Sequence, residues 1–156
     1  AYQQSFGLST LAFRFFNVYG PRQRAGHVYA AVIPLFIDAL INGRPLQIHG
    51  DGTQSRDFTY VGTVCNVIRE AVRVRASYPE PVNLASGTNT SILDLVRQIE
   101  AVAGVSPLIE FTPPRKGDVP HSQADNTKLL SMFPEVCPVD LTTGLEQTLQ
   151  WFKENS

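Results

Sequence analysis

Residues 11–21 read LAFRFFNVYGP, and this stretch decides the fold class. The short, bulky, mostly apolar run from Leu11 to Phe16, closed by Asn17 and by Gly20-Pro21, predicts a buried strand that ends in a turn. Residues 2–6 precede it and end at a glycine, which is typical of the last turns of a helix. A helix, a turn and a buried strand in this order predict an α/β unit.

The rest of the chain continues this alternation of helix and strand. Further helices are predicted at 29–42, 62–75, 92–103 and 125–132, with a closing helix after a capping box at Thr143–Glu146. Further strands are predicted at 46–49, 57–61, 81–86 and 108–111, and an ordered loop at 112–124. The strongest helix signal is 92–103, because Thr90 or Ser91 precedes it as a cap and Gly104 follows it as a stop.

Composition limits the possible partners. The chain has 156 residues, one domain's worth, with a net charge of −1. Because this balance supplies no basic field, neither nucleic acid nor an anionic membrane is expected as a partner. Only 17% of the residues are charged, which suggests that part of the surface is covered.

The cysteines and the apolar runs indicate the compartment. Cys65 and Cys137 are far apart in the sequence, in no metal-binding or redox spacing, so we expect both to be buried in a reducing, cytoplasmic protein. The apolar run at 29–41 is interrupted by Pro34 and is shorter than the about 20 residues that cross a bilayer. The chain lacks an initiator Met, and we expect it to begin inside a longer sequence.

Several common site motifs do not fit. Gly50-x-Gly52 lacks the third glycine of a dinucleotide fingerprint, and strand-like residues follow it where that fingerprint needs a helix. His27, His49 and His121 have no metal-ligand spacing, so no metal site is predicted. The residue patterns alone therefore predict an α/β domain without naming its chemistry.

Five segments say more. They are FFNVYGPRQ (15–23), YAAVIP (29–34), HGDGTQSRDF (49–58), NLASG (83–87) and RKGDVPHS (115–122), in this order. Together they resemble the C-terminal half of the extended short-chain dehydrogenases/reductases that act on nucleotide sugars, the NAD-dependent epimerase/dehydratase family. The resemblance covers essentially the whole chain. It implies that 1–156 forms the substrate-binding portion of an extended Rossmann-type α/β enzyme, with small sheets and about five helices.

The family's other half carries the glycine-rich NAD fingerprint and the catalytic Tyr-x-x-x-Lys pair. The resemblance therefore implies that no catalytic residue lies in this chain, that NAD is bound mainly elsewhere, and that the chain alone is inactive. Strands 11–16 and 81–86 would complete the Rossmann sheet of that other half. Because cut sheets expose their edges, we expect this chain to self-associate, and the resemblance implies a homodimeric parent.

Four residues match the family's diphosphate and ribose contacts. Asn17 matches an asparagine that touches the diphosphate, and Arg56 and Arg115 match two arginines that hold it. A planar, permanently charged guanidinium suits phosphate oxygens. Asp118 matches a carboxylate that accepts hydrogen bonds from ribose hydroxyls. The alternatives are turn formation for Asn17 and Asp118, and surface ion pairs for the arginines.

Other matches concern the base and the sugar. Gln47 and His49 match strand positions that line the uracil, largely through backbone groups. The family often has Asn-Asn-Leu where this chain has Ala-Ala-Val at 30–32, so only the backbone of Val32 carries over. Together with Ser122, a small residue where an aromatic would crowd an N-acetyl group, this resembles the UDP-N-acetylglucosamine 4-epimerase branch.

The resemblance implies a UDP-sugar 4-epimerase. In that reaction NAD removes a hydride from C4 of the sugar, the 4-keto intermediate turns over, and the hydride returns to the other face. Phe15 is expected near the nicotinamide. The alternatives are a 4,6-dehydratase or decarboxylase of the same family, or a non-catalytic sensor that binds nucleotide sugars.

Overall fold

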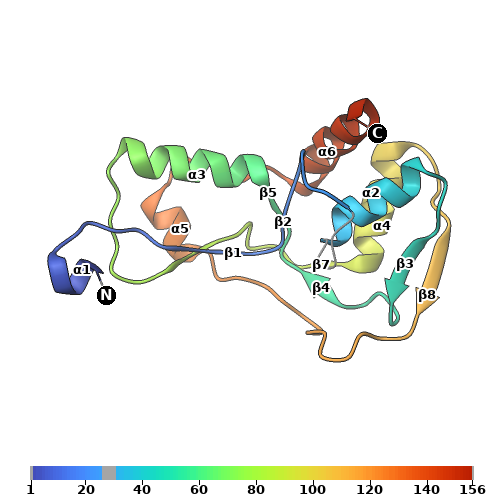
Figure 1. The fold of residues 1–156 in the computed structure, drawn as a ribbon, viewed down its shortest axis with the longest axis horizontal. Helices are drawn as coiled ribbons and strands as arrows, with labels where there is room; N and C mark the ends of the chain where they lie inside the picture. The colour runs from blue at the N-terminus through green and yellow to red at the C-terminus, as the bar shows by residue number, and fades with distance from the viewer. Residues whose placement is uncertain (1, 26–30, 156) are drawn as a thin grey trace.

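The computed structural model describes residues 2–25 and 31–155 (Figure 1). The helices are α1 (Tyr2–Phe6), α2 (Val32–Ile41), α3 (Val61–Arg73), α4 (Ile92–Ala103), α5 (Thr127–Met132) and α6 (Leu141–Asn155). The strands are β1 (Phe13–Phe15), β2 (Val18–Tyr19), β3 (Leu46–His49), β4 (Ser55–Arg56), β5 (Thr59–Tyr60), β6 (Val82–Leu84), β7 (Thr90–Ser91) and β8 (Ile109–Thr112). The order alternates helix and strand, so the predicted α/β class is confirmed.

One group of elements surrounds β1 and β6, on the left of Figure 1. These strands pair in parallel, with Phe13 opposite Val82. Helices α3 and α5 contribute Val67 and Leu129 to the buried cluster that β6 lines. The strands predicted at 11–16 and 81–86 therefore lie side by side, although each is shorter than predicted. The prediction that the first is buried is wrong, because Arg14 and Phe15 are exposed on β1, which pairs only with β6 among the described strands.

A second group, on the right of Figure 1, builds the surroundings of the site. Strands β3 and β8 pair in parallel, and α2, α4 and α6 pack with β3 in one buried cluster. Along β3 the side chains alternate, so that Leu46 and Ile48 are buried while Gln47 is exposed. Because successive side chains of a strand point to opposite faces, Gln47 and His49 share the face turned away from the core.

Strands β2 and β5 lie between the two groups, and their aromatic rings belong to the buried cluster of the second group. Strands β2 and β5 pair in parallel and place Tyr19 beside Tyr60, with ring centroids 5.6 Å apart. The Tyr19 hydroxyl donates a hydrogen bond to the carbonyl oxygen of Leu141, at 3.3 Å. A Cβ at Gly144 would lie only 2.1 Å from that hydroxyl, so α6 can approach the ring only through a glycine.

Two local predictions are wrong. Cys65 and Cys137 are both exposed, because Cys65 falls on the outer side of α3 and Cys137 lies in the loop before α6. Helix α6 begins before the expected capping box: the Asp140 carboxylate accepts the backbone N–H of Thr143, at 2.9 Å, so Asp140 is the cap.

Two further predictions need qualification. The strand expected at 57–61 is shortened to β5, because α3 begins at Val61, and β4 lies just before the predicted range. The start of the helix predicted from Tyr29 lies outside the described residues, and α2 is described from Val32 with Pro34 in its first turn.

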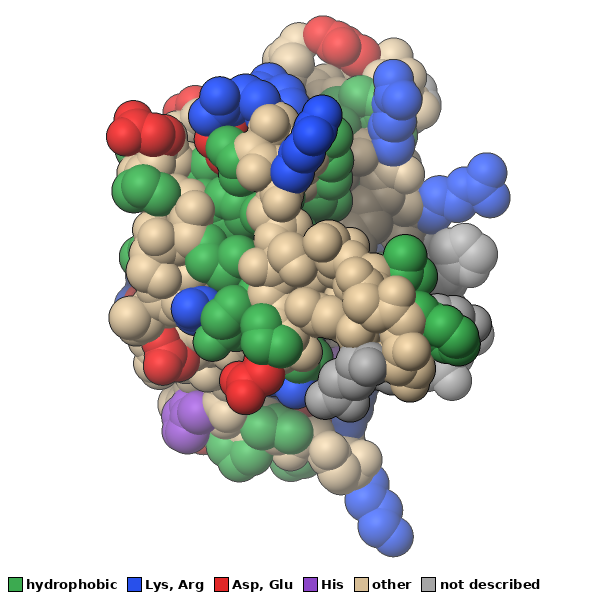
Figure 2. Space-filling view, turned by 90° about the vertical axis from the view of Figure 1, so that its left-hand side faces the viewer, with side chains coloured by type: hydrophobic (Ala, Val, Ile, Leu, Met, Phe, Trp, Pro, Cys, Tyr) green, Lys and Arg blue, Asp and Glu red, His purple; other side chains and the backbone are tan. Residues whose placement is uncertain are grey.

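Hydrophobic side chains reach the surface at the end that holds α1 and the end of α3 (Figure 2). Phe6 and Val72 are the most exposed of them. Self-association through such surfaces stays a prediction. In the part of the chain that the structure describes, no helix is long and apolar enough to cross a membrane.

The cap of α4 gives a test of the fold. The Ser91 hydroxyl accepts the backbone N–H of Asp94, at 3.0 Å, which satisfies a donor that the helix itself leaves free. We expect Ser91→Ala to lower the free energy of unfolding by about 1 kcal/mol. Urea denaturation measures this change. The control Thr142→Ala, at an exposed position, should change it by less than about 0.5 kcal/mol, and equal values for both variants would contradict the cap.

Candidate functional site

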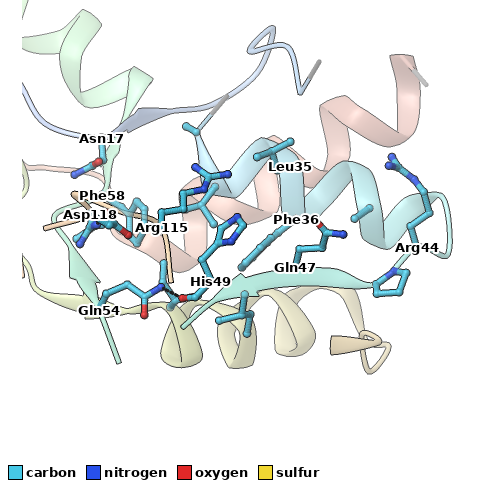
Figure 3. Close-up of a pocket in the computed structure, with 17 residues that line it drawn as sticks. Asn17, Leu35, Phe36, Arg44, Gln47, His49, Gln54, Phe58, Arg115 and Asp118 are labelled. Carbon is cyan, nitrogen blue, oxygen red and sulfur yellow. Dashed lines mark hydrogen bonds and ion pairs between the residues drawn. The ribbon is translucent and has the colours of Figure 1, made fainter. Parts of the chain in front are cut away.

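A cavity of about 470 Å³ opens between α2, β3 and the segment that follows β8. Figure 3 shows Asn17, Phe58 and Asp118 at one end of it and Arg44 at the other, with Arg115 and His49 between them. Residues expected to bind substrate line it from distant parts of the sequence: Asn17, Val32, Gln47, His49, Arg56, Arg115 and Asp118. The fold therefore gathers most of these residues around one space.

Arg56 is held in place at the charged end. Its guanidinium forms an ion pair with the Asp118 carboxylate. The same group donates to the carbonyl oxygen of Ser55, at 2.7 Å, and to that of Pro120, at 3.4 Å. The side chain is only 15% exposed. Because its position is already restricted, little conformational entropy is lost when it meets an anion.

Residues 113–122, which we call the strap, carry the second arginine. Ser55 on β4 binds the strap on both sides: its N–H donates to the Pro120 carbonyl at 2.9 Å, and its carbonyl accepts the Ser122 N–H at 3.1 Å. The Asp118 N–H donates to the Arg115 carbonyl, at 3.2 Å, which closes a turn. The strap therefore presents Arg115 and Asp118 to the same cavity.

The middle of the cavity is a slot between α2 and β3. Leu35, Phe36 and Ala39 line it from the helix, opposite Gln47 and His49 on the strand. The His49 ring is fixed by a 2.7 Å hydrogen bond between its Nδ1 and the Thr112 hydroxyl, and the His49 carbonyl accepts from the Gln54 amide at 2.6 Å. An apolar wall facing polar groups is the usual surrounding of a planar ligand ring.

Asn17 has a backbone conformation that few residues adopt. Its φ is +32°, in the left-handed region that asparagine tolerates better than most side chains. Its amide donates to the Asp57 carbonyl, at 3.1 Å, and its own carbonyl accepts the Thr59 N–H, at 3.3 Å. The turn after β1 is thereby tied to the β4–β5 segment at the charged end.

Two of the expected site residues do not line the cavity. Phe15 lies on β1 with 57% of its surface exposed. Ser122 lies on the strap where it pairs with β4. Ser122 is nevertheless close to the charged end, because its N–H and the Arg56 guanidinium donate to the same Ser55 carbonyl oxygen.

Other cavity residues were not anticipated. They include Arg44, Gln54, Phe36 and Phe58. Gln54 and Phe58 belong to the segment 49–58, and this position could have predicted that they lie at the site. The far-end Arg44, which forms an ion pair with Asp38, had no local signal.

Two kinds of site expected to be absent concern metal ions and the dinucleotide fingerprint. Among residues 2–25 and 31–155, no cluster of three or more His, Cys, Asp or Glu side chains could hold a metal ion. The turn at Gly50 and Gly52 leads into β4, whereas a dinucleotide fingerprint opens a helix. This turn therefore does not have the arrangement of that fingerprint.

Comparison with known proteins agrees with this geometry. A UDP-N-acetyl-alpha-D-glucosaminuronate decarboxylase of Bacillus cytotoxicus is 35% identical over 95% of this chain and 47% of its own. A UDP-glucose 4-epimerase of Mycolicibacterium smegmatis is 35% identical over 90% of this chain and 44% of its own. This chain therefore spans about half the length of the curated relatives it matches.

Solved structures give the same picture. The UDP-N-acetylglucosamine 4-epimerase of Methanobrevibacter ruminantium, in complex with UDP-N-acetylmuramic acid, is similar with a TM-score of 0.89 and 35% identity, over 99% of this chain and 49% of that one. The model of the NAD dependent epimerase/dehydratase family matches residues 1–85. Sequence family, relatives and fold agree, and the chain belongs to the NAD dependent epimerase/dehydratase family.

Proposed function

We propose that this chain binds the nucleotide part of a UDP-sugar for an NAD-dependent 4-epimerase. The observation that carries the proposal is the cavity itself, which has two arginines at or near one end and a slot for a planar ring beyond them. A nucleoside diphosphate has the matching order of groups: a planar base, a ribose and a dianionic diphosphate. The similar structure from Methanobrevibacter ruminantium, which holds a UDP-linked sugar, supports this proposal.

The diphosphate belongs beside Arg56 and Arg115. Charge-assisted hydrogen bonds from a guanidinium to phosphate oxygens are stronger than hydrogen bonds between neutral groups, and two guanidinium groups can bind one diphosphate. In the first turn of α2 the N–H groups left for a ligand are those of Val32 and Ile33, because Pro34 has none and the Leu35 N–H donates to the Ala31 carbonyl, at 3.4 Å. Val32 lies at the cavity wall. Asn17 lies at the same end and can contribute its amide.

Base and ribose follow from the positions of the remaining groups. The slot between Phe36 and Gln47 accepts the uracil, with polar groups of β3 at its edge. The Asp118 carboxylate accepts hydrogen bonds from the ribose hydroxyls. To do so, it must either share its oxygens with Arg56 or leave the ion pair with that residue. Binding therefore replaces the contact between Arg56 and Asp118, in part, by contacts between the arginines and the diphosphate. The affinity for UDP should then fall as the salt concentration rises, because salt screens these charges.

The reaction itself is proposed for the whole protein. No tyrosine of this chain is followed four positions later by lysine, so the family's catalytic pair is not in these residues. Of the described residues, only Phe15 was expected near the nicotinamide. We therefore expect no epimerisation from this chain alone with NAD and UDP-N-acetylglucosamine.

A second reaction of the same family deserves comparison. One of the 35% identical relatives is named a decarboxylase of a UDP-linked sugar acid. Both reactions need the same nucleotide site, so the cavity fits either. If the whole protein binds nucleotide sugars in this cavity but catalyses no reaction, it would instead act as a nucleotide-sugar sensor.

Arg115 gives the direct test. Calorimetric titration should show UDP and UDP-N-acetylglucosamine binding to the chain. Arg115→Ala should weaken UDP binding by about tenfold or more, because a charge-assisted contact contributes roughly 1.5–3 kcal/mol. NAD should give no heat with either protein.

The matched control is Arg69→Ala, an exposed arginine on α3 away from the cavity. It should leave UDP affinity unchanged. An equal loss in both variants would indicate non-specific charge attraction, and wild-type silence towards every UDP ligand would contradict the proposed function.

Ser122 tests the sugar assignment. Ser122→Tyr should weaken binding of UDP-N-acetylglucosamine by about tenfold while UDP binding changes by less than about twofold, because only the sugar would meet the added ring. Competition between UDP and UDP-N-acetylglucosamine in one titration measures the ratio of their affinities. Equal affinities of both proteins for the N-acetyl sugar would show that Ser122 lies away from it.

A further inference from the structure

A buried carboxylate lies where the segments of the site meet. Asp57 is 0% exposed. Its Oδ2 accepts hydrogen bonds from the backbone N–H of Gly87, at 3.0 Å, and of Ala124, at 3.2 Å. Its Oδ1 has no hydrogen-bond partner within the part of the chain that the structure describes. The carboxylate does not line the cavity.

The surroundings of Asp57 act on its carboxylate in opposite directions. Burial raises the pKa of Asp57, and the backbone N–H groups of Ala124, Gly87, Ser86 and Thr88 only partly oppose that rise. The charged form is thus penalised by loss of water. What distinguishes this side chain is the set of distant segments that its two hydrogen bonds hold together.

Asp57 joins the separate segments that carry the arginines and the asparagine of the site. Its main-chain neighbour is Arg56, and its backbone carbonyl accepts the amide of Asn17. Its carboxylate holds Ala124, two residues beyond the end of the strap that carries Arg115. One residue therefore contacts the β4–β5 segment, the turn after β1 and the end of the strap.

The second partner, Gly87, explains how the contact is possible. Its φ is +76°, and a Cβ there would lie 2.7 Å from the side-chain amide of Asn126. Only a glycine lets this backbone N–H reach the carboxylate with Asn126 in place. The Gln123 amide also donates to the Gly87 carbonyl, at 2.9 Å, so the turn after β6 and the end of the strap are held together.

We propose that Asp57 is a positioning residue for diphosphate recognition: its carboxylate fixes the end of the strap relative to β4 and thereby sets the spacing between Arg56 and Arg115. This inference rests on the proposed function and deepens it. Asp57 touches no ligand in this scheme. The base slot between α2 and β3 does not depend on it, because β3 is held by β8 and by the core.

The test compares two ligands that differ only in phosphate. The 156-residue chain is titrated with UDP and with uridine, and affinities are followed by NMR chemical shifts. Asp57→Ala should weaken UDP binding by about tenfold or more, because small displacements of charged contacts are costly, and uridine binding by less than about twofold. Asp57→Asn, whose amide oxygen can accept both N–H groups, should restore UDP affinity to within about threefold of wild type.

The matched control removes a different buried side-chain hydrogen bond, one that lies within α6 and does not involve the strap. Thr148 is fully buried in α6 and donates to the Gly144 carbonyl, at 2.6 Å. Thr148→Ala should lower the melting temperature and leave the ratio of UDP to uridine affinity unchanged. A purely structural role of Asp57 would instead weaken both ligands alike, and that result overturns the proposal.

A second measurement needs no ligand. Hydrogen exchange in Asp57→Ala should become faster at the amides of 118–124 and stay unchanged in β3 and β8. Unchanged protection of 118–124 overturns the proposal. Wild-type silence towards both UDP and uridine would overturn the proposed function together with this proposal, whereas equal loss of UDP and uridine in Asp57→Ala overturns only the latter.

Discussion

The pairing of Ser55 with the strap is the contact on which the site depends. Two backbone hydrogen bonds, from Ser55 to Pro120 and from Ser122 to Ser55, bring together segments that are distant in the sequence. Arg56 lies on β4, which also pairs with β7, whereas Arg115 lies on the exposed strap, so these two hydrogen bonds are what attach the strap to the strand of Arg56. The ion pair of Arg56 with Asp118 forms across the same pairing and is shielded on one side by it.

Local signals located the regular elements well. Helix α4 has the predicted bounds because Ser91 caps it, Gly104 adopts φ +71° after it, and its apolar face is continuous. The start of α6 was misplaced because two capping signals overlap: Thr143 with Glu146, and Asp140 with Thr143. The sequence contains both patterns, and only the packing of α6 selects the second.

The site was less accessible to local reasoning. Arg56 and Arg115 could be associated only through the family resemblance, since no periodicity connects a strand residue with a residue in a proline-rich loop. Cys65 shows the same limit, because its place on the outer side of α3 depends on what the helix packs against. Asp57 lay inside a quoted motif, yet its burial follows from three distant contacts that no short window contains.

The cavity has a rigid part and a less constrained part. Its slot is built from α2 and β3, whose other faces lie in the core, whereas the strap is exposed and held mainly at its ends. Under the proposed function, a base that enters the slot gains from a preformed shape, and the phosphates gain from the charges of Arg56 and Arg115. The two curated relatives described above are named for different reactions, and both names include a UDP-linked sugar. When the nucleotide is bound independently of the sugar, its binding energy can orient any sugar that is attached to it. Proteins that share such a nucleotide site can therefore evolve to catalyse different reactions on the sugar.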